Sequence, residues 1–429
     1  MRVLKCTSCD LLLQEIPVQR GFSACCPGCG SRVIKNSSLS RSGEVAITFA
    51  ALALFVPAQL FPLLSINLVG VPLSTTVTSG GLTLLDTFPL VGMLVVFCTA
   101  IAPLLFLVSI LAANLALHFH HAKSLYFATY CLKVIKHWVM IDVFLVSLAV
   151  AGFKVIEIAE ISVGPALLSF VLLQVLVAFL LSRISPKRYW DVYSVNDEAI
   201  QDIDIDDAKT NVQATNALST NELNTTGFST NKVETETLIR CQHCGLTQKS
   251  NHDCCFRCSA KLEPRVFQSL QKTWASLLAA IVFIFPANFY PISILLSNGK
   301  RFEDTIFSGV AGLIKQGMYG IAIIIFTASI IVPVAKIIGL LYILICIQLN
   351  VEMGRGQRMK IYRFVKWIGK WSMMDLCVIA IMVSLIDRGN LLDFTPGPGA
   401  IAFGLVVVLT MISADSLDSR LIWDKHEQR

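Results

Sequence analysis

The chain has 429 residues, of which 55% are hydrophobic and only 15% charged, and its mean hydropathy is +0.67. This composition excludes an ordinary soluble enzyme and predicts several membrane-spanning helices. The formal net charge of +6 is small and lies mainly beside the apolar runs. That placement suits membrane topology and anionic lipid headgroups better than nucleic acid, so no nucleic-acid partner is expected.

The first polar segment carries two CxxC pairs, Cys6-x2-Cys9 and, after sixteen further residues, Cys26-x2-Cys29. Four thiolates in two such pairs are the usual ligands of a tetrahedral structural zinc ion. The alternative is a redox dithiol, which would need only one CxxC pair.

A shorter set of the same kind follows in mid-chain, with Cys241-x2-Cys244 and then Cys255-x2-Cys258. We therefore expect two zinc ions, one in each zinc ribbon. A site closed by four cysteines has no open coordination position, so both ions should be structural rather than catalytic.

Eight apolar runs predict eight membrane spans, four on each side of a polar segment that is rich in Asn, Thr, Asp and Glu. We expect an all-α polytopic membrane protein. The expected spans are 45–68, 89–117, 127–152, 164–182, 273–297, 318–349, 364–386 and 399–414. The expected domains are zinc ribbon 1 at 1–40, transmembrane module 1 at 41–193, a flexible acidic linker at 194–237, zinc ribbon 2 at 238–264 and transmembrane module 2 at 265–429.

Two motifs recur in the same order in both halves. Pro57-Ala-Gln-Leu-Phe-Pro62 returns 229 residues later as Pro286-Ala-Asn-Phe-Tyr-Pro291, and Trp138-Val-Met-Ile-Asp142 returns 233 residues later as Trp371-Ser-Met-Met-Asp375. Because order and spacing persist, the chain is predicted to be a tandem duplication of a four-helix module.

Lys and Arg concentrate in alternate loops, which by the positive-inside rule places both termini and both ribbons in the cytoplasm. A reducing compartment keeps CxxC pairs available for metal. With four spans per half, the two repeats share one orientation. The histidines of the loop 118–137 are better explained as part of a cytoplasmic loop than as metal ligands.

One cation, Lys336, lies near the middle of the apolar run 319–349. An ammonium there costs about 2.5–3.5 kcal/mol, so it should face protein or water and have a partner. The candidate partners are Asp375 and, in the first half of the chain, Lys154 and Glu157. Ser329, Ser372 and Thr410 could join a Lys336–Asp375 pair.

Three alternatives remain open for these groups. Lys336 could extend to the membrane interface instead of lying among helices. Lys154 and Glu157, spaced i,i+3, could pair with each other. The Lys–Asp pair could relay protons or form a static salt bridge.

No hydrolase, phosphate-binding, dinucleotide-binding or HExxH motif is present, so the chain is not expected to be an enzyme. Uphill transport would have to draw on an ion gradient.

The two four-cysteine ribbons, each heading a four-span module, and the paired Pro-Ala-x-x-x-Pro and Trp-x-Met-x-Asp motifs resemble the paraquat-inducible protein A family. The stretches 269–278, 303–309 and 417–424 resemble one branch of it, and the similarity covers nearly the whole chain except the acidic linker.

The resemblance implies a multi-pass inner-membrane protein of a Gram-negative cell that works with a periplasmic MCE-domain tunnel protein. Such a pair would move phospholipid or other lipids between the inner and outer membranes. A membrane redox protein or a passive anchor for the tunnel are the alternatives. The resemblance also implies that a polar cluster matters for transport: Lys154, Glu157, Ser329, Lys336, Ser372, Asp375 and Thr410.

Overall fold

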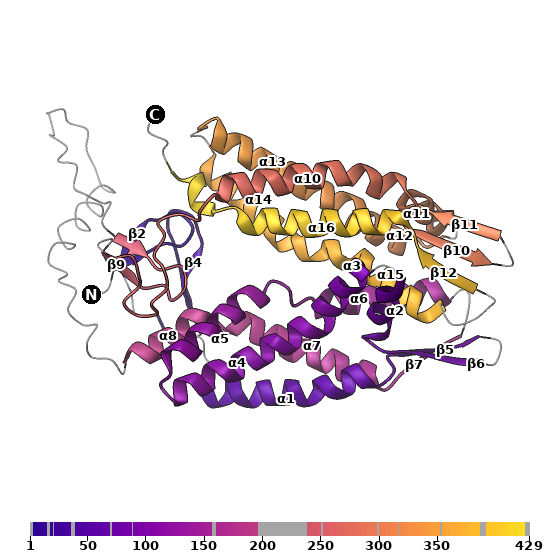
Figure 1. The fold of residues 1–429 in the computed structure, drawn as a ribbon, viewed down its shortest axis with the longest axis horizontal. Coiled ribbons are helices and arrows are strands. Elements are labelled where there is room, and N and C mark those ends of the chain that lie inside the picture. Colours follow the sequence, from indigo (N-terminus) through magenta and orange to yellow (C-terminus); the bar gives the residue numbers. More distant parts are fainter. Residues whose placement is uncertain are drawn as a thin grey trace. The chain divides into compact units, whose positions relative to one another are not determined.

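The structure is a computed structural model and describes residues 3–14, 18–19, 21–35, 39–68, 71–87, 89–156, 160–195, 238–249, 252–297, 300–315, 317–351, 354–386 and 392–424. These residues are mostly helical, with short strands between the helices (Figure 1). The chain divides into two compact units. The smaller contains Met1–Ser40, Ala112–Tyr130 and Ile184–Phe267, and the larger contains Arg41–Leu111, Cys131–Arg183 and Gln268–Arg429.

The smaller unit contains both cysteine-rich segments, built from short antiparallel hairpins. The predicted ribbons each precede their own transmembrane module, yet the two fold together. The strands of this unit are β1 (Val3–Lys5) with β2 (Leu12–Gln14), β3 (Ser23–Cys25) with β4 (Arg32–Lys35), and β8 (Leu238–Arg240) with β9 (Thr247–Lys249).

Hydrogen bonds and an ion pair join the two ribbons. The backbone N–H of Lys5 donates to Thr247 Oγ1 at 3.4 Å, and Lys5 Nζ donates to the carbonyl of Leu238 at 3.3 Å. Arg265, just after the second ribbon, forms an ion pair with Asp10 in the first. The two ribbons are therefore in direct contact within the smaller unit.

The first half of the chain contains helices and one three-stranded sheet, whose strand order is β6-β5-β7. The elements are α1 (Arg41–Leu60), β5 (Leu64–Leu68), β6 (Val71–Thr75), α2 (Ser79–Thr87), α3 (Pro89–Val96), the π-helical turn η1 (Phe97–Ile101), α4 (Ala102–His118), α5 (Ala122–Ile135), α6 (Ile141–Ile156), β7 (Glu160–Val163), α7 (Ala166–Arg183) and α8 (Pro186–Val195).

The second half repeats this order closely, with a sheet of order β11-β10-β12 (Figure 1). The elements are α10 (Ser269–Phe289), β10 (Ser293–Ser297), β11 (Lys300–Asp304), α11 (Ile306–Lys315), α12 (Tyr319–Phe326), the π-helical turn η5 (Thr327–Ile331), α13 (Val332–Gln348), α14 (Arg355–Ile368), the 3₁₀ turn η6 (Gly369–Met373), α15 (Met374–Ile386), β12 (Leu392–Pro396), α16 (Pro398–Ser416) and η7 (Ser419–Ile422). This is the order that a duplication would produce, although the duplication itself stays a prediction.

Seven described helices are long and apolar enough to cross a membrane, where the sequence predicts eight spans. The predicted span 127–152 is interrupted, because α5 ends at Ile135 and α6 begins at Ile141. The break contains Lys136 and His137, two polar residues that the predicted span places inside one apolar run. α6 is a shorter apolar helix.

The expectation of an all-α protein was too narrow, because each half contains a small sheet. The first predicted span, 45–68, ends as a helix at Leu60, and β5 takes up its last residues. Pro57 is tolerated inside α1, but Pro62 lies beyond its end, where the missing N–H no longer interrupts a helix. The run 273–297 divides in the same way into α10 and β10.

Within the larger unit, elements from both halves of the chain meet at α15. Ser147 Oγ of α6 donates to the carbonyl of Met374 at 2.9 Å, and the hydroxyls of Ser79 and Ser384 are 2.6 Å apart. Gly80 allows this approach, since a Cβ there would lie 2.3 Å from the carbonyl oxygen of Ala380.

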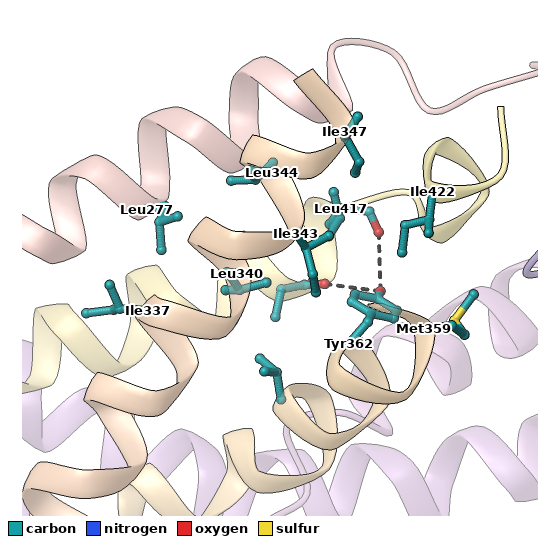
Figure 2. Close-up of a cluster of buried hydrophobic side chains, with 12 residues drawn as sticks. Leu277, Ile337, Leu340, Ile343, Leu344, Ile347, Met359, Tyr362, Leu417 and Ile422 are labelled. Atoms are coloured by element: carbon teal, nitrogen blue, oxygen red, sulfur yellow. Dashed lines mark hydrogen bonds between the residues drawn. The ribbon is translucent and has the colours of Figure 1, made fainter. Parts of the chain in front are cut away.

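A buried apolar cluster joins α10, α13, α14, α16 and η7 (Figure 2). Tyr362 OH donates to the carbonyls of Ala414 and Leu417 at 3.3 and 3.2 Å, so α14 is fixed to the end of α16.

Candidate functional site

Lys336 lies inside the helix bundle of the larger unit, and its exposed fraction is 0%. It follows the π-helical turn η5 by five residues, and π-helical turns inside α-helices are frequent at functional sites. Its Nζ donates a hydrogen bond of 2.7 Å to Thr410 Oγ1 and one of 3.4 Å to Ser372 Oγ. The cation is therefore held among helices and does not reach out to an interface.

The two acceptors come from separate elements, so folding of the larger unit assembles the site. Thr410 belongs to α16, and its own hydroxyl proton points to the carbonyl of Val407 at 2.9 Å. That leaves an oxygen lone pair facing the ammonium. Ser372 is 1% exposed and lies in η6, between α14 and α15.

Two further predicted members of the cluster, Ser329 and Asp375, lie in η5 and α15. Ser329 is 2% exposed, and its Oγ has no hydrogen-bond partner among the described residues. Asp375 lies in the first turn of α15, where the helix dipole favours an acid. The described hydrogen bonds of Lys336 go to hydroxyls, and its pairing with Asp375 stays a prediction.

Two predicted residues of the first half cannot be placed in the cluster. Lys154 is in α6, but its side chain is not described, and Glu157 lies outside the described residues. Their mutual pairing therefore stays a prediction.

Asp375 lines a small pocket of about 60 Å³ that reaches the second sheet. Sequence reasoning missed this pocket, because its walls come from four separate segments. The other lining residues are Ile292, Ser293, Asp304, Thr305, Ile306, Gly309, Val310, Leu313, Ile325, Val378, Ile379 and Met382.

The eight predicted metal ligands form two groups of four, as their spacing predicts. In each group the Sγ atoms all lie within 4.8 Å of one another, and these two groups are the candidate metal sites among the described residues. In the first, Sγ of Cys6 and Cys29 are 3.6 Å apart and Sγ of Cys9 and Cys26 are 3.5 Å apart.

The second group has the same geometry and is buried at all four ligands. Sγ of Cys241 and Cys258 are 3.6 Å apart, and Sγ of Cys244 and Cys255 are 3.5 Å apart. Zn–S bonds of about 2.3 Å in a tetrahedron place sulfurs roughly 3.8 Å apart, so both groups fit a zinc ion.

The surroundings of Cys6 favour its thiolate. Burial opposes ionisation, but the hydrogen bonds from Ser31 and from backbone amides outweigh it and lower the pKa of Cys6 to about 7. Ser31 Oγ lies 3.2 Å from Cys6 Sγ and 2.8 Å from Cys29 Sγ. Four thiolates so close together need a cation among them, which is what a bound metal supplies.

His243 attaches the second ribbon to helices of its own unit, a contact that sequence reasoning missed. Its ring stacks on Tyr126 with centroids 4.3 Å apart, and Trp190 meets it edge-on at 6.1 Å. Trp190 in turn donates to Thr129 Oγ1 at 3.2 Å. A histidine inside a CxxC turn gives no sequence signal for such a role.

The family described as Paraquat-inducible protein A matches residues 42–194 and 270–427. Lipophilic envelope-spanning tunnel protein A of Escherichia coli K12 is 35% identical over 424 residues, which covers 99% of this chain and 91% of that protein.

A probable intermembrane transport protein of Haemophilus influenzae is 32% identical over 441 residues, covering 100% of this chain and 97% of the relative. Intermembrane transport protein PqiA of Escherichia coli K12 is 29% identical over 433 residues, covering 99% and 96%. No solved structure matches the chain.

Proposed function

This chain belongs to the paraquat-inducible protein A family, and from that premise we propose that it is the inner-membrane subunit of an intermembrane lipid transport system. It loads or unloads phospholipid at a periplasmic tunnel protein with MCE domains, a LetB-like partner. Two relatives that this chain covers over nearly their whole length are named for intermembrane transport, and a third is named as a lipophilic envelope-spanning tunnel protein, which supports this proposal.

The single observation that carries the proposal is the buried ammonium of Lys336. Holding a cation inside a membrane bundle costs about 2.5–3.5 kcal/mol, and the hydrogen bonds described for Lys336 go to two neutral hydroxyls, which supply no counter-charge. A purely structural position would be filled at lower cost by an apolar residue. A transported lipid carries a phosphate, the anion that such a cation complements.

Proton coupling through this cluster is part of the proposal. The sequence carries no nucleotide-binding motif, and one charge that moves through 100 mV supplies about 2.3 kcal/mol. Lys336 would change its charge as Asp375 or the cargo approaches, with Ser329, Ser372 and Thr410 as hydrogen-bonding groups around it. Lys154 and Glu157 would contribute from the first half.

The two four-cysteine groups would each hold a structural zinc ion. Both ribbons, and both termini, would face the cytoplasm, which suits the cations that flank the spans. The zinc would fix each CxxC turn and leave no position open for chemistry.

Complementation of a strain with an envelope defect tests the function. Lys336→Ala should abolish growth rescue at a normal protein level, whereas Lys272→Ala, which removes an exposed cation at the start of α10, should retain it. Full rescue by Lys336→Ala would reject a transport role for the cluster and favour a passive anchor.

A redox function makes a different prediction. If the cysteines work as electron carriers, purified protein should contain iron or a redox-active disulfide in place of zinc. Cross-linking in membranes, followed by identification of the linked proteins and lipids, tests the tunnel partner directly.

A further inference from the structure

The pocket of about 60 Å³ beside Asp375 lies between α11, α12, α15 and the second sheet (Figure 1). Along α15 its wall is formed by Asp375, Val378, Ile379 and Met382, which follow one another at i, i+3, i+4 and i+7. The three apolar residues of this stripe are buried. Because seven residues of helix span about 10 Å, the pocket is an elongated slot along one face of α15.

The helices α2 and α11 begin in the same way in the two halves. Before α2, the backbone N–H of Thr76 donates to Ser79 Oγ at 3.0 Å, and that of Ser79 donates to Thr76 Oγ1 at 3.2 Å. At the start of α11, Thr305 and Ser308 make the same reciprocal hydrogen bonds at 2.9 and 3.2 Å. The two helices can therefore be compared residue by residue.

The first half fills the space that the second half leaves open. At the spacing of the Pro-Ala motifs, Gly309 of α11 corresponds to Gly80 of α2. A Cβ on Gly80 would lie 2.3 Å from the carbonyl oxygen of Ala380, so α2 packs directly on α15. A Cβ on Gly309, which lines the pocket, would meet no described atom within 4 Å. The pocket is thus a place where close helix packing is missing.

The walls of the pocket are mainly aliphatic. Ile306, Val310 and Leu313 of α11 and Ile325 of α12 line it together with the apolar stripe of α15. The polar lining residues lie toward the ends of the slot. Ser293, Asp304 and Thr305 belong to the sheet and to the turn after it, and Asp375 begins the stripe on α15.

Size and polarity together select the occupant. A cavity needs about 10–15 Å³ to hold one water, so this pocket holds roughly four to six groups the size of a water or a methylene. A partner helix, about 10–12 Å across, is too wide. A file of waters would lack polar partners between the apolar walls, where each water needs about two to four. An unbranched hydrocarbon chain needs none.

The hairpin of α11 and α12 also presents an apolar outer face. Phe307, Ile314 and Ile323 are exposed, and α12 begins one of the candidate membrane spans. Exposed apolar surface of this kind marks contact with a membrane. Hydrocarbon chains are therefore available one helix away from the pocket.

We infer that the pocket between α11, α12 and α15 binds a single acyl chain of a membrane lipid. The inference rests on the proposed transport of lipid and adds the place that holds the hydrocarbon part of the cargo. The missing side chain of Gly309 leaves room for the chain, and the aliphatic walls replace the bilayer interior around it. A chain in this position displaces water from the wall that Asp375 forms.

Photolabelling of the full chain tests the pocket. The protein is reconstituted in phosphatidylcholine vesicles with a trace of phosphatidylcholine that carries a diazirine near the end of one acyl chain. After illumination, mass spectrometry identifies the labelled residues. We expect label on Val378, Ile379 or Met382, which bulk lipid does not reach because they are buried. Exposed Phe307 is the positive control, and Ile381, equally buried on another face of α15, should stay unlabelled.

Two glycine variants on the same helix identify the pocket as the source of this label. Gly309→Leu fills the slot and should reduce labelling of the α15 stripe by roughly 15-fold, since each of two excluded methylenes weakens binding about fourfold. Gly312→Leu is the matched control, because a Cβ there also meets no described atom within 4 Å but the residue does not line the pocket. It should keep the labelling.

Two further samples separate this inference from the proposed function. Lys336→Ala, which should fail in transport, should keep the label on α15, because Lys336 does not line the pocket. A free fatty acid with the same diazirine distinguishes the source of the chain. Label from the fatty acid alone would support an acyl-chain pocket and count against phospholipid as the cargo.

Label confined to the outer faces of the helices in wild type would overturn the inference, whatever the variants do, and would leave the proposed function to the complementation test. Undiminished labelling of the α15 stripe in a folded Gly309→Leu protein would overturn it as well, because the chain would then lie elsewhere.

Discussion

The ammonium of Lys336 lies 2.7 Å from the hydroxyl oxygen of Thr410, and that hydroxyl donates its proton to the carbonyl of Val407. Because the hydroxyl proton is already donated, the Thr410 oxygen acts as a hydrogen-bond acceptor for the ammonium. Removing it leaves a buried charge with one fewer partner.

Thr410→Val should therefore lower the free energy of unfolding by about 1–3 kcal/mol, the cost of an unmet buried hydrogen bond. Thermal unfolding in detergent measures this change. Thr410→Ser keeps the hydroxyl and should stay close to wild type. An equally stable Thr410→Val protein would show that Lys336 finds another acceptor.

Metal analysis of the purified full-length chain should find close to two zinc ions. Cys241→Ser should reduce this to one, because a tetrahedral site with three thiolates binds zinc far less tightly. Cys254→Ser is the matched control, since this exposed cysteine adjoins a ligand but belongs to neither group. Two ions retained in Cys241→Ser would contradict the assigned ligands.

Gly397 should tolerate no side chain. A Cβ at this position would lie 2.1 Å from the carbonyl oxygen of Pro291, and the same holds for Gly164 and Pro62 at 2.0 Å. Gly397→Ala should destabilise the protein by roughly 1–3 kcal/mol, because backbone must move. Gly320→Ala, inside α12 with open space around it, should unfold at the wild-type temperature or slightly above.

His137, in the turn between α5 and α6, should make stability depend on pH. Burial, and then the charge of Lys366, lower its pKa below the ordinary 6.5, with Asp415 opposing. As the pH falls below about 6.5, His137 binds a proton in the unfolded chain but stays neutral in the folded chain. The free energy of unfolding therefore decreases as the pH falls. Above pH 7 the residue contributes no pH dependence.

Melting temperatures of wild type and His137→Gln between pH 5 and 8 measure this effect. The variant should show a shallower loss on acidification, and the two curves should run parallel above pH 7. Parallel curves over the whole range would show that His137 does not titrate differently in the folded protein.

Family membership and the two metal-binding groups could be predicted from the sequence because their signals are local. CxxC spacing fixes which sulfurs converge, and Lys336 stands out in an apolar run because charges are rare there. The family assignment is confirmed, while zinc and the transport role of the cluster stay predictions.

The remaining features depend on contacts that no local pattern encodes. The partner of Asp10 is Arg265, 255 residues away, so ribbon pairing was not foreseen. Lys136 and His137 mark the break between Ile135 and Ile141, but the predicted span continues across them. The strands after Pro62 and Pro291 are as apolar as the helices before them, so the sequence pattern does not separate the two.

The stacking of His243 on Tyr126 bears on how the chain can be divided. A fragment that stops at residue 195 keeps Tyr126 and Trp190 but loses the imidazole that covers them. The half-length polypeptide therefore exposes an aromatic surface on α5 and α8 that the full chain covers, and co-expression of the missing ribbon in trans should cover it again.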